Sequence, residues 1–319
     1  MRRWAAALLA TATILGAGCN TDPREAYTTV PRTVPPTGPT TPAPTGTCTA
    51  EPSAPTTKAY AEVEGVDPDL LSVDVYELPA ECGPRPVLFW VHGGGWMVGD
   101  KGNQIDDKVA LAATYGWVLV SVNYRLSSPG AGVQWPTHGN DVAAAMAYTL
   151  DHADDFGIDP EHVAVMGHSS GAHLAAIVTV DPALLKAAGH SRNEIACMVL
   201  LDTEGYSITA LIDEAPEADV LRIEAIFGED FTTLQQASPN FVLSQQPRQT
   251  ADALVVTRGD LERQALAVDF ADLVKATGAN AEMVFADGYS HEEVNDAVGL
   301  LTDQLINPAV TTFLSGCLG

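Results

Sequence analysis

Seven short runs of apolar residues recur along the chain after residue 58, and each of them stops at a glycine or a polar residue. The run at 71–78 alternates apolar and polar positions, which predicts a strand with one exposed face. The other six are almost continuously apolar, as strands buried on both faces of a parallel sheet are. They cover residues 86–92, 117–124, 162–168, 196–202, 252–259 and 281–288.

Longer amphipathic stretches lie between these runs and predict helices. They cover residues 103–114, 138–153, 170–179, 262–277 and 292–314. Strands that alternate with helices predict an α/β fold, in which helices flank a mostly parallel central sheet. Residues 205–246 interrupt the alternation and predict a small cap. In such sheets, active sites gather beyond the carboxyl ends of the strands.

The N-terminus has the pattern of an export signal over residues 1–18. Arg2 and Arg3 precede an apolar stretch that is too short to span a bilayer comfortably. The sequence "LGAGC" resembles a bacterial lipoprotein processing site with Cys19 as the lipidated residue, although Leu15 lies one position too early. We therefore expect an exported protein, either a cell-surface lipoprotein held to the membrane by its N-terminal lipid or a secreted or periplasmic one.

Proline and threonine dominate residues 19–57, where no apolar periodicity appears. Such a segment cannot bury enough apolar surface to offset its ordering entropy, so we expect an extended linker. The folded catalytic domain is expected over residues 58–319. The net charge of −25 excludes nucleic acid as a plausible partner, because binding its phosphates requires clustered lysines and arginines.

The five cysteines fit an oxidising compartment. Cys19 belongs to the signal, which leaves an even number for disulfides. Four cysteines allow three pairings, of which we prefer Cys48–Cys82 and Cys197–Cys317. No CxxC spacing occurs, so we expect no metal site.

The stretch "VMGHSSGAHLAA" carries the first candidate chemistry. It leaves an apolar strand, turns through two glycines that flank Ser169, and enters an alanine-rich helix. This pattern is typical of a nucleophile elbow, which exposes a strained serine at the top of a sheet. An ordinary strand-to-helix turn with a serine N-cap is the alternative.

Three consecutive glycines follow the predicted strand at 86–92. Their backbone N–H groups could approach a substrate oxygen closely, as stabilisation of a tetrahedral intermediate requires. We interpret the backbone of Gly94, Gly95 and Ser170 as oxyanion donors. Gly93 would allow the turn.

A base and an acid should follow the serine in the order Ser, acid, His. His291 lies in the loop after the last predicted strand, so we interpret it as the base. Asp260 directly follows the glycine at the end of a strand and is our preferred acid. Glu262 and Asp202 remain alternatives.

The motifs "HGGGW", "NYRL", "WPTHGNDVAAAMAY", "FGIDPEHVAVMGHSSGAHLAA" and "ASP" resemble α/β-hydrolases of the hormone-sensitive-lipase-like esterase group over roughly residues 65–315. They are closer still to feruloyl or acetyl-xylan esterases and kynurenine formamidases. The resemblance implies the α/β-hydrolase fold and a triad of Ser169, Asp260 and His291. It also implies a structural ion pair between Arg125 and Asp141. The spacing "RGDLER" departs from the acid motif of the family.

The expected activity is hydrolysis of short-chain carboxylic esters, a small-molecule substrate class, with no cofactor. The alternatives are an arylformamidase and a non-catalytic binding lipoprotein on the same scaffold. Four side chains are candidates to line the pocket: Trp96, Met97, Tyr206 and Phe231.

Overall fold

The computed structural model describes residue 24, residue 27 and residues 54–245 and 248–319. The signal segment 1–18, Cys19, Cys48 and most of the expected linker lie outside the described residues. The expectations that fall on them therefore stay predictions.

The described elements are built on an eight-stranded sheet with the order β1-β2-β4-β3-β5-β6-β7-β8. β1 and β2 pair antiparallel, as do β2 and β4, and all other neighbours are parallel. The strands are β1 Thr56–Ala59, β2 Ser72–Tyr76, β3 Arg85–Val91, β4 Val118–Val122, β5 Ile158–His168, β6 Cys197–Leu201, β7 Asp252–Thr257 and β8 Ala281–Phe285.

All seven predicted strands are present, and the sequence pattern missed only β1 among the described strands. β1 begins at Thr56, inside the expected linker. It is a mostly exposed edge strand without a hydrophobic face, so it carries no apolar pattern. The continuous apolar runs are explained by burial, because every residue of β4 and of β6 is buried.

Helices follow most strands, and four of the five predicted helices are confirmed as single helices. The described α-helices are α1 Asp106–Tyr115, α2 Thr137–Asp151, α3 Ser170–Val180, α4 Pro182–Ala187, α5 Ile208–Glu214, α6 Glu217–Phe227, α7 Phe231–Gln236, α8 Pro239–Ser244, α9 Leu261–Ala276, α10 His291–Asp296 and α11 Ile306–Leu318. The helix expected over 292–314 is wrong as one element. It divides into α10 and α11, because Asp303 accepts the backbone N–H groups that begin α11.

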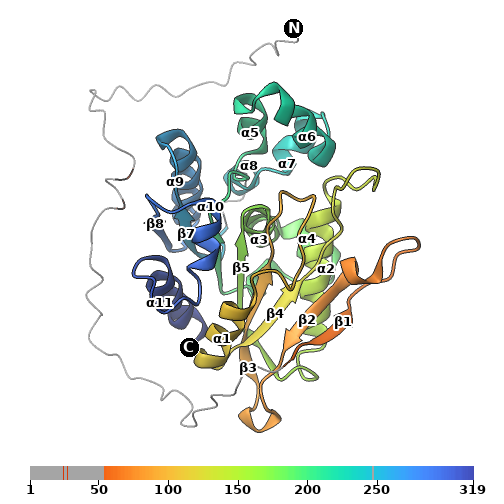
Figure 1. Cartoon of the computed structure of the whole chain (residues 1–319), viewed down its shortest axis with the longest axis vertical. Coiled ribbons are helices and arrows are strands. Elements are labelled where there is room, and N and C mark those ends of the chain that lie inside the picture. The colour runs from red at the N-terminus through yellow and green to blue at the C-terminus, as the bar shows by residue number, and fades with distance from the viewer. Residues whose placement is uncertain (1–23, 25–26, 28–53, 246–247) are drawn as a thin grey trace. The chain divides into compact units, whose positions relative to one another are not determined.

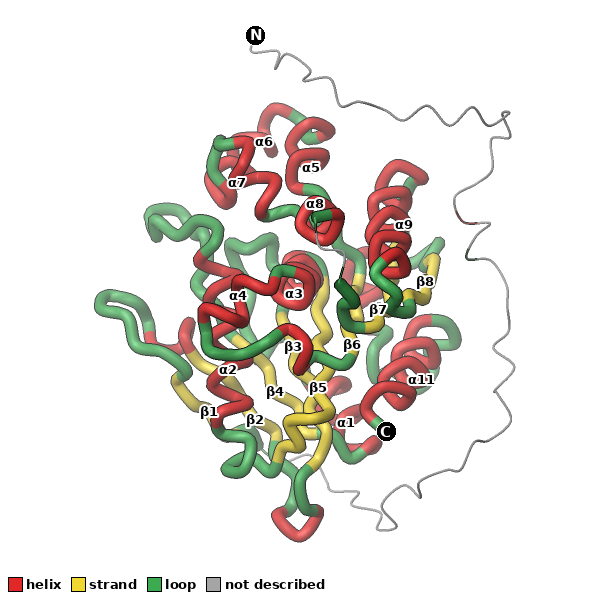
Figure 2. The backbone as a smooth tube through the Cα atoms, turned by 180° about the vertical axis from the view of Figure 1, so that it is seen from behind, coloured by secondary structure: helices red, strands yellow, loops and turns green. Residues whose placement is uncertain are grey.

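Helices cover both faces of the sheet. α1 and α11 pack on one face around Trp90 and Met166, while α2, α3 and α9 lie on the opposite face (Figures 1 and 2). The interruption predicted at 205–246 contains α5, α6, α7 and α8. Of these, α5, α6 and α7 lie together beyond the sheet, and we call these three helices the cap.

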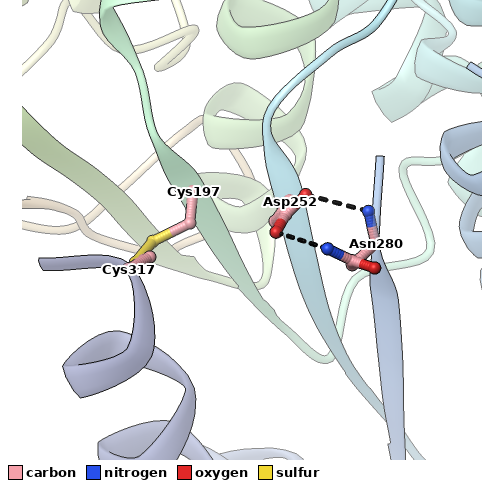
Figure 3. Close-up of a disulfide and its surroundings, with 4 residues drawn as sticks. All are labelled: Cys197, Asp252, Asn280 and Cys317. Carbon is pink, nitrogen blue, oxygen red and sulfur yellow. Dashed lines mark hydrogen bonds between the residues drawn. A yellow bond between two sulfur atoms is a disulfide. The ribbon is translucent and has the colours of Figure 1, made fainter. Parts of the chain in front are cut away.

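The predicted disulfide between Cys197 and Cys317 is confirmed (Figure 3). It joins the first residue of β6 to the last turn of α11, and the two Cα atoms lie 6.4 Å apart. Nearby, the carboxylate of Asp252 accepts hydrogen bonds from the backbone and side-chain N–H groups of Asn280 at 2.8 and 2.9 Å. The pairing Cys48–Cys82 stays a prediction, because Cys48 lies outside the described residues.

Candidate active site

Ser169 lies between β5 and α3 in a strained backbone conformation, with φ 55° and ψ −123°. A non-glycine residue in such a region costs about 1–3 kcal/mol and persists where the surroundings enforce it. A Cβ on Gly167 would lie 2.3 Å from the carbonyl oxygen of Gly171, and one on Gly171 would lie 2.1 Å from that of Val91. The two glycines are therefore required by close backbone crossings on either side of the serine, as in a nucleophile elbow.

The three-glycine loop passes directly against this turn. A Cβ built on Gly93 would lie 3.1 Å from the Cβ of Ser169. Within the described part of the chain, the backbone N–H groups of Gly94, Gly95 and Ser170 donate no hydrogen bond. These donors are thus free on the residue after Ser169 and on the loop that contacts it at Gly93, which fits the oxyanion hole that the sequence predicts.

His291 is the first residue of α10 and contacts the turn through His168. The two imidazole rings lie 4.4 Å apart, and Nε2–H of His168 donates to the carbonyl oxygen of His291 at 2.9 Å. Burial, together with the nearby His291, lowers the pKa of His168 to about 3, so His168 is neutral under ordinary conditions. His168 therefore positions the loop of His291 without competing for a proton.

The carboxylate that holds His291 is that of Asp202. Nδ1–H of His291 donates to Oδ2 of Asp202 at 2.6 Å. Asp202 directly follows β6, and the backbone N–H of Ser169 donates to Leu201 at 2.9 Å, so the aspartate lies on the strand next to the serine. Its backbone is left-handed, with φ 50°, and its side chain is fully buried.

Two arginines from the segment after β7 complete the surroundings of Asp202. Nε of Arg258 lies 2.7 Å from Oδ2, and Nη2 of Arg263 lies 2.7 Å from Oδ1. Burial raises the pKa of Asp202, but the hydrogen bond from His291 and the charge of Arg263 outweigh it, so the pKa is lowered overall. The carboxylate is thus held in its ionised form.

The expectation that Asp260 contacts His291 is corrected by this geometry. Asp260 is exposed and caps α9, where its Oδ1 accepts the backbone N–H of Arg263 at 2.9 Å. Glu262 lies in the first turn of the same helix and is also exposed. Both residues lie beyond the end of β7, which pairs with β6 and not with β5, the strand that leads to Ser169. A carboxylate directly after an apolar run was the available sequence signal for Asp202.

The four pocket candidates lie in different surroundings. Trp96 is buried, and its indole N–H donates to Nδ1 of His173 at 3.1 Å. Tyr206 is completely buried with its ring stacked on another aromatic ring, so it is a core residue and its assignment to the pocket is corrected. Phe231 is 55% exposed at the start of α7. Met97 is half-buried beside the glycine loop.

The ion pair implied between Arg125 and Asp141 is confirmed. It is bidentate, with distances of 2.8 Å from Nε to Oδ2 and 2.6 Å from Nη2 to Oδ1. Nδ1–H of His92 donates to the carbonyl oxygen of Gly93 at 2.7 Å, and its ring stacks on that of Tyr124. Both contacts stiffen the segment that carries the glycine loop.

The described ranges offer neither a metal-binding cluster nor a membrane-spanning helix. No group of three or more His, Cys, Asp or Glu side chains in them is arranged to hold a metal ion. In the same part of the chain, no helix combines the length and the apolar character that crossing a bilayer requires.

The BD-FAE family matches residues 73–256, which is more than half of the chain. A relative from Mycobacterium tuberculosis, a probable carboxylic ester hydrolase called LipM, is 37% identical over 100 residues. That alignment covers 31% of this chain and 22% of the relative. The first curated relatives are thus matched over only about a quarter of their own length.

Solved structures are matched over most of their length. A hyperthermophilic esterase from Pyrobaculum calidifontis is 26% identical, with a TM-score of 0.61 over 77% of this chain and 80% of that protein. A truncated carbohydrate esterase from gut microbiota has a TM-score of 0.65 at 18% identity, over 84% of this chain and 98% of that protein. The second likeness supports the fold alone.

Proposed function

The chain belongs to the BD-FAE family and has the α/β-hydrolase fold, and from this premise we propose that it is a serine esterase that cleaves short-chain carboxylic esters. The observation that carries the proposal is the hydrogen bond between His291 and Asp202 beside the strained turn of Ser169. Strained residues other than glycine cluster at active sites, so this conformation supports a reactive serine over an unreactive scaffold.

In the proposed reaction, His291 removes the proton of the Ser169 hydroxyl as the serine attacks the ester carbonyl. Asp202 holds the imidazole in the tautomer that has its free nitrogen toward the serine, and it stabilises the imidazolium that forms. His291 then protonates the leaving alcohol, and an acyl-enzyme remains. A water molecule, activated by the same histidine, releases the acid.

The negative charge that develops on the carbonyl oxygen needs donors that are already in place. The N–H groups of Gly94 and Gly95, on the loop that meets Ser169 at Gly93, and that of Ser170 have no partner among the described residues and can supply them. Loss of one such donor costs about 10²–10³-fold in kcat in other serine hydrolases. The fixed glycine loop thus accounts for a large part of the expected rate.

A preference for short acyl groups is supported by the packing of Trp96, which directly follows the three glycines. The ring of Trp96 is packed between His173 and Phe227, with centroid distances of 5.3 and 5.0 Å. A side chain held in this way cannot swing aside to admit a long chain. We therefore expect acetate and butyrate esters to be cleaved faster than esters longer than about eight carbons.

Labelling with a fluorophosphonate probe, followed by peptide mass spectrometry, tests the assignment of the nucleophile. We expect the label on Ser169, and we expect Ser169→Ala to lower kcat by about 10⁶-fold. Ser170→Ala is the matched control, because it keeps Ser169 and its own backbone N–H and should still be labelled. Retention of a tenth of the activity by Ser169→Ala, or a label on another serine, would refute the proposal.

A further inference from the structure

The cap lies against the glycine loop through the C-terminal end of α6. The ring of Phe227 packs edge-on against Trp96, at 5.0 Å and 79°. The backbone N–H of Trp135 donates to the carbonyl oxygen of Ile226 at 2.8 Å, and the side-chain amide of Gln134 donates to the carbonyl oxygen of Ala225 at 3.1 Å. These contacts fix the position of α6 relative to the loop that begins at Gly93.

Arg222 lies five residues before Phe227, about one and a half helical turns away. A Cβ built on Gly95 would lie 3.5 Å from Nη1 of Arg222, so the guanidinium reaches the backbone of the proposed oxyanion loop. The side chain is 46% exposed and therefore accessible from solvent. A cation of the cap thus lies against Gly95, one of the residues whose backbone N–H groups are interpreted as oxyanion donors.

The guanidinium of Arg222 is not committed to a strong partner. Its Nη2 lies 3.4 Å from Asp219, three residues earlier on the same exposed helix surface, where side-chain exposures are 46% and 47%. Exposed pairs of this kind contribute about 0–1 kcal/mol and exchange easily with other anions. Nη1, the nitrogen nearest the loop, has no hydrogen-bond partner within the described residues.

The other guanidinium groups near the site are already engaged. Arg125 binds Asp141, and Arg258 and Arg263 both bind Asp202. Arg222 is also the sole lysine or arginine in the sequence between residues 205 and 246. Seven carboxylates share that stretch: Asp213, Glu214, Glu217, Asp219, Glu224, Glu229 and Asp230.

We infer that Arg222 binds a carboxylate of the substrate, so that the preferred substrates are esters that carry a free carboxylate close to the scissile bond. This inference rests on the proposed esterase function and deepens it. A guanidinium can bind a carboxylate through two parallel hydrogen bonds, which gives orientation as well as affinity. The net charge of −25 disfavours anions at long range, but salt screens that potential beyond about 8–10 Å. Within this distance of the site, the nearby guanidinium of Arg222 attracts the carboxylate.

Two pairs of matched esters test the inference in a pH-stat assay. In the first pair, methyl hydrogen succinate carries a carboxylate on its acyl side and methyl pentanoate is its neutral counterpart. In the second pair, acetoxyacetic acid carries the carboxylate on its alcohol side and propyl acetate is the neutral counterpart. The measured quantity is kcat/KM of the acidic ester divided by kcat/KM of its neutral counterpart. For at least one pair, Arg222→Gln should lower this ratio about 10-fold or more, as the loss of a charged hydrogen bond does. Arg222→Lys should recover part of that ratio, because it retains the charge.

Arg248→Gln is the matched control, since Arg248 is exposed and its substitution changes the net charge by the same amount. It should leave the ratio unchanged in either pair, and melting curves of all variants establish that they are folded. If Arg222→Gln leaves both ratios within about twofold, or Arg248→Gln lowers them equally, the inference is overturned. If the wild type cleaves none of the four esters and Ser169 takes no label, the proposed function itself fails.

Discussion

At the scale of single residues, Asp202 is the side chain on which the site depends most. It is fully buried and receives hydrogen bonds from His291, Arg258 and Arg263. A buried carboxylate with this many charged donors is stable only as an anion, and its lowered pKa agrees with that. The cationic partners come from the segment after β7, where the sequence had suggested the acid itself.

The two candidate acids can be separated by conservative substitutions. Asp202→Asn should lower kcat by about 10⁴-fold, because it favours the wrong tautomer of the histidine. Asp260→Asn should have a mild effect, because asparagine caps a helix as well as aspartate does. Steady-state kinetics with p-nitrophenyl acetate measure both, and Glu262→Gln is a further control. The reverse order of effects would restore Asp260 as the acid.

Lys108 is a second unusual residue, since it is only 1% exposed. Its Nζ donates to the carbonyl oxygens of Gln104 and Asn295 and lies 4.6 Å from the centre of the Trp90 ring. Burial lowers its pKa from 10.5 to about 8. The amine therefore holds the C-terminal end of α10 in place through its hydrogen bond to Asn295, although its burial costs desolvation energy.

Because the pKa of Lys108 is lowered in the folded protein, the free energy of unfolding should rise as the pH rises. Between about pH 8 and 10.5 the unfolded chain binds the lysine proton and the folded chain does not, so stability rises with pH. Relative to Lys108→Met, the wild type should gain up to about 3 kcal/mol of unfolding free energy across that window. Urea unfolding at pH 7, 8.5 and 9.5 measures the difference. A constant difference would show that the lysine does not titrate there.

At the scale of elements, α11 is held against the sheet by hydrophobic packing and by a disulfide bond. The disulfide connects residues 120 apart in the sequence, so it removes much entropy from the unfolded chain. α11 also supplies Val310, Phe313 and Leu314 to the hydrophobic cluster on its face of the sheet. The end of the chain is therefore part of the core.

Removal of this disulfide should destabilise the fold without changing the catalytic groups. The double substitution Cys197→Ala with Cys317→Ala should lower the free energy of unfolding by up to about 5 kcal/mol, the chain-entropy value for a loop of 120 residues. Guanidinium unfolding of wild type with and without a reductant provides the comparison. The reduced wild type should be destabilised at least as much as the variant, because a reductant would also open the predicted Cys48–Cys82 disulfide. Equal midpoints for all three samples would contradict the expected contribution.

At the scale of the whole molecule, the disulfide supports the proposal that the protein is exported to an oxidising compartment. We propose that the export signal and Cys19 attach it to a membrane by a lipid. Mass spectrometry of the membrane-extracted protein should then find a mature chain that begins at Cys19 with an added lipid mass. Cys19→Ala should appear in the soluble fraction. A mature chain with another start and no lipid would contradict the anchor.

The sequence by itself determined the order of strands β2 to β8 and of the main helices between them, the nucleophile turn and the glycine loop. Each of these depends on local chemistry: buried strands need continuous apolar runs, and the close crossings at Gly167 and Gly171 admit no side chain. His291 was also predictable, because chain order and a loop after the last strand both pointed to it.

Only the tertiary structure decided which carboxylate meets His291, which aromatic side chains are core, and what α6 presents to the glycine loop. Asp202 and Asp260 each follow a strand, and their local sequences do not distinguish them. The difference arises because β6 neighbours β5 in the sheet, whereas Asp260 is drawn away to cap α9. Which strands are neighbours, and where a cap helix comes to rest, are set by contacts between residues far apart in the chain.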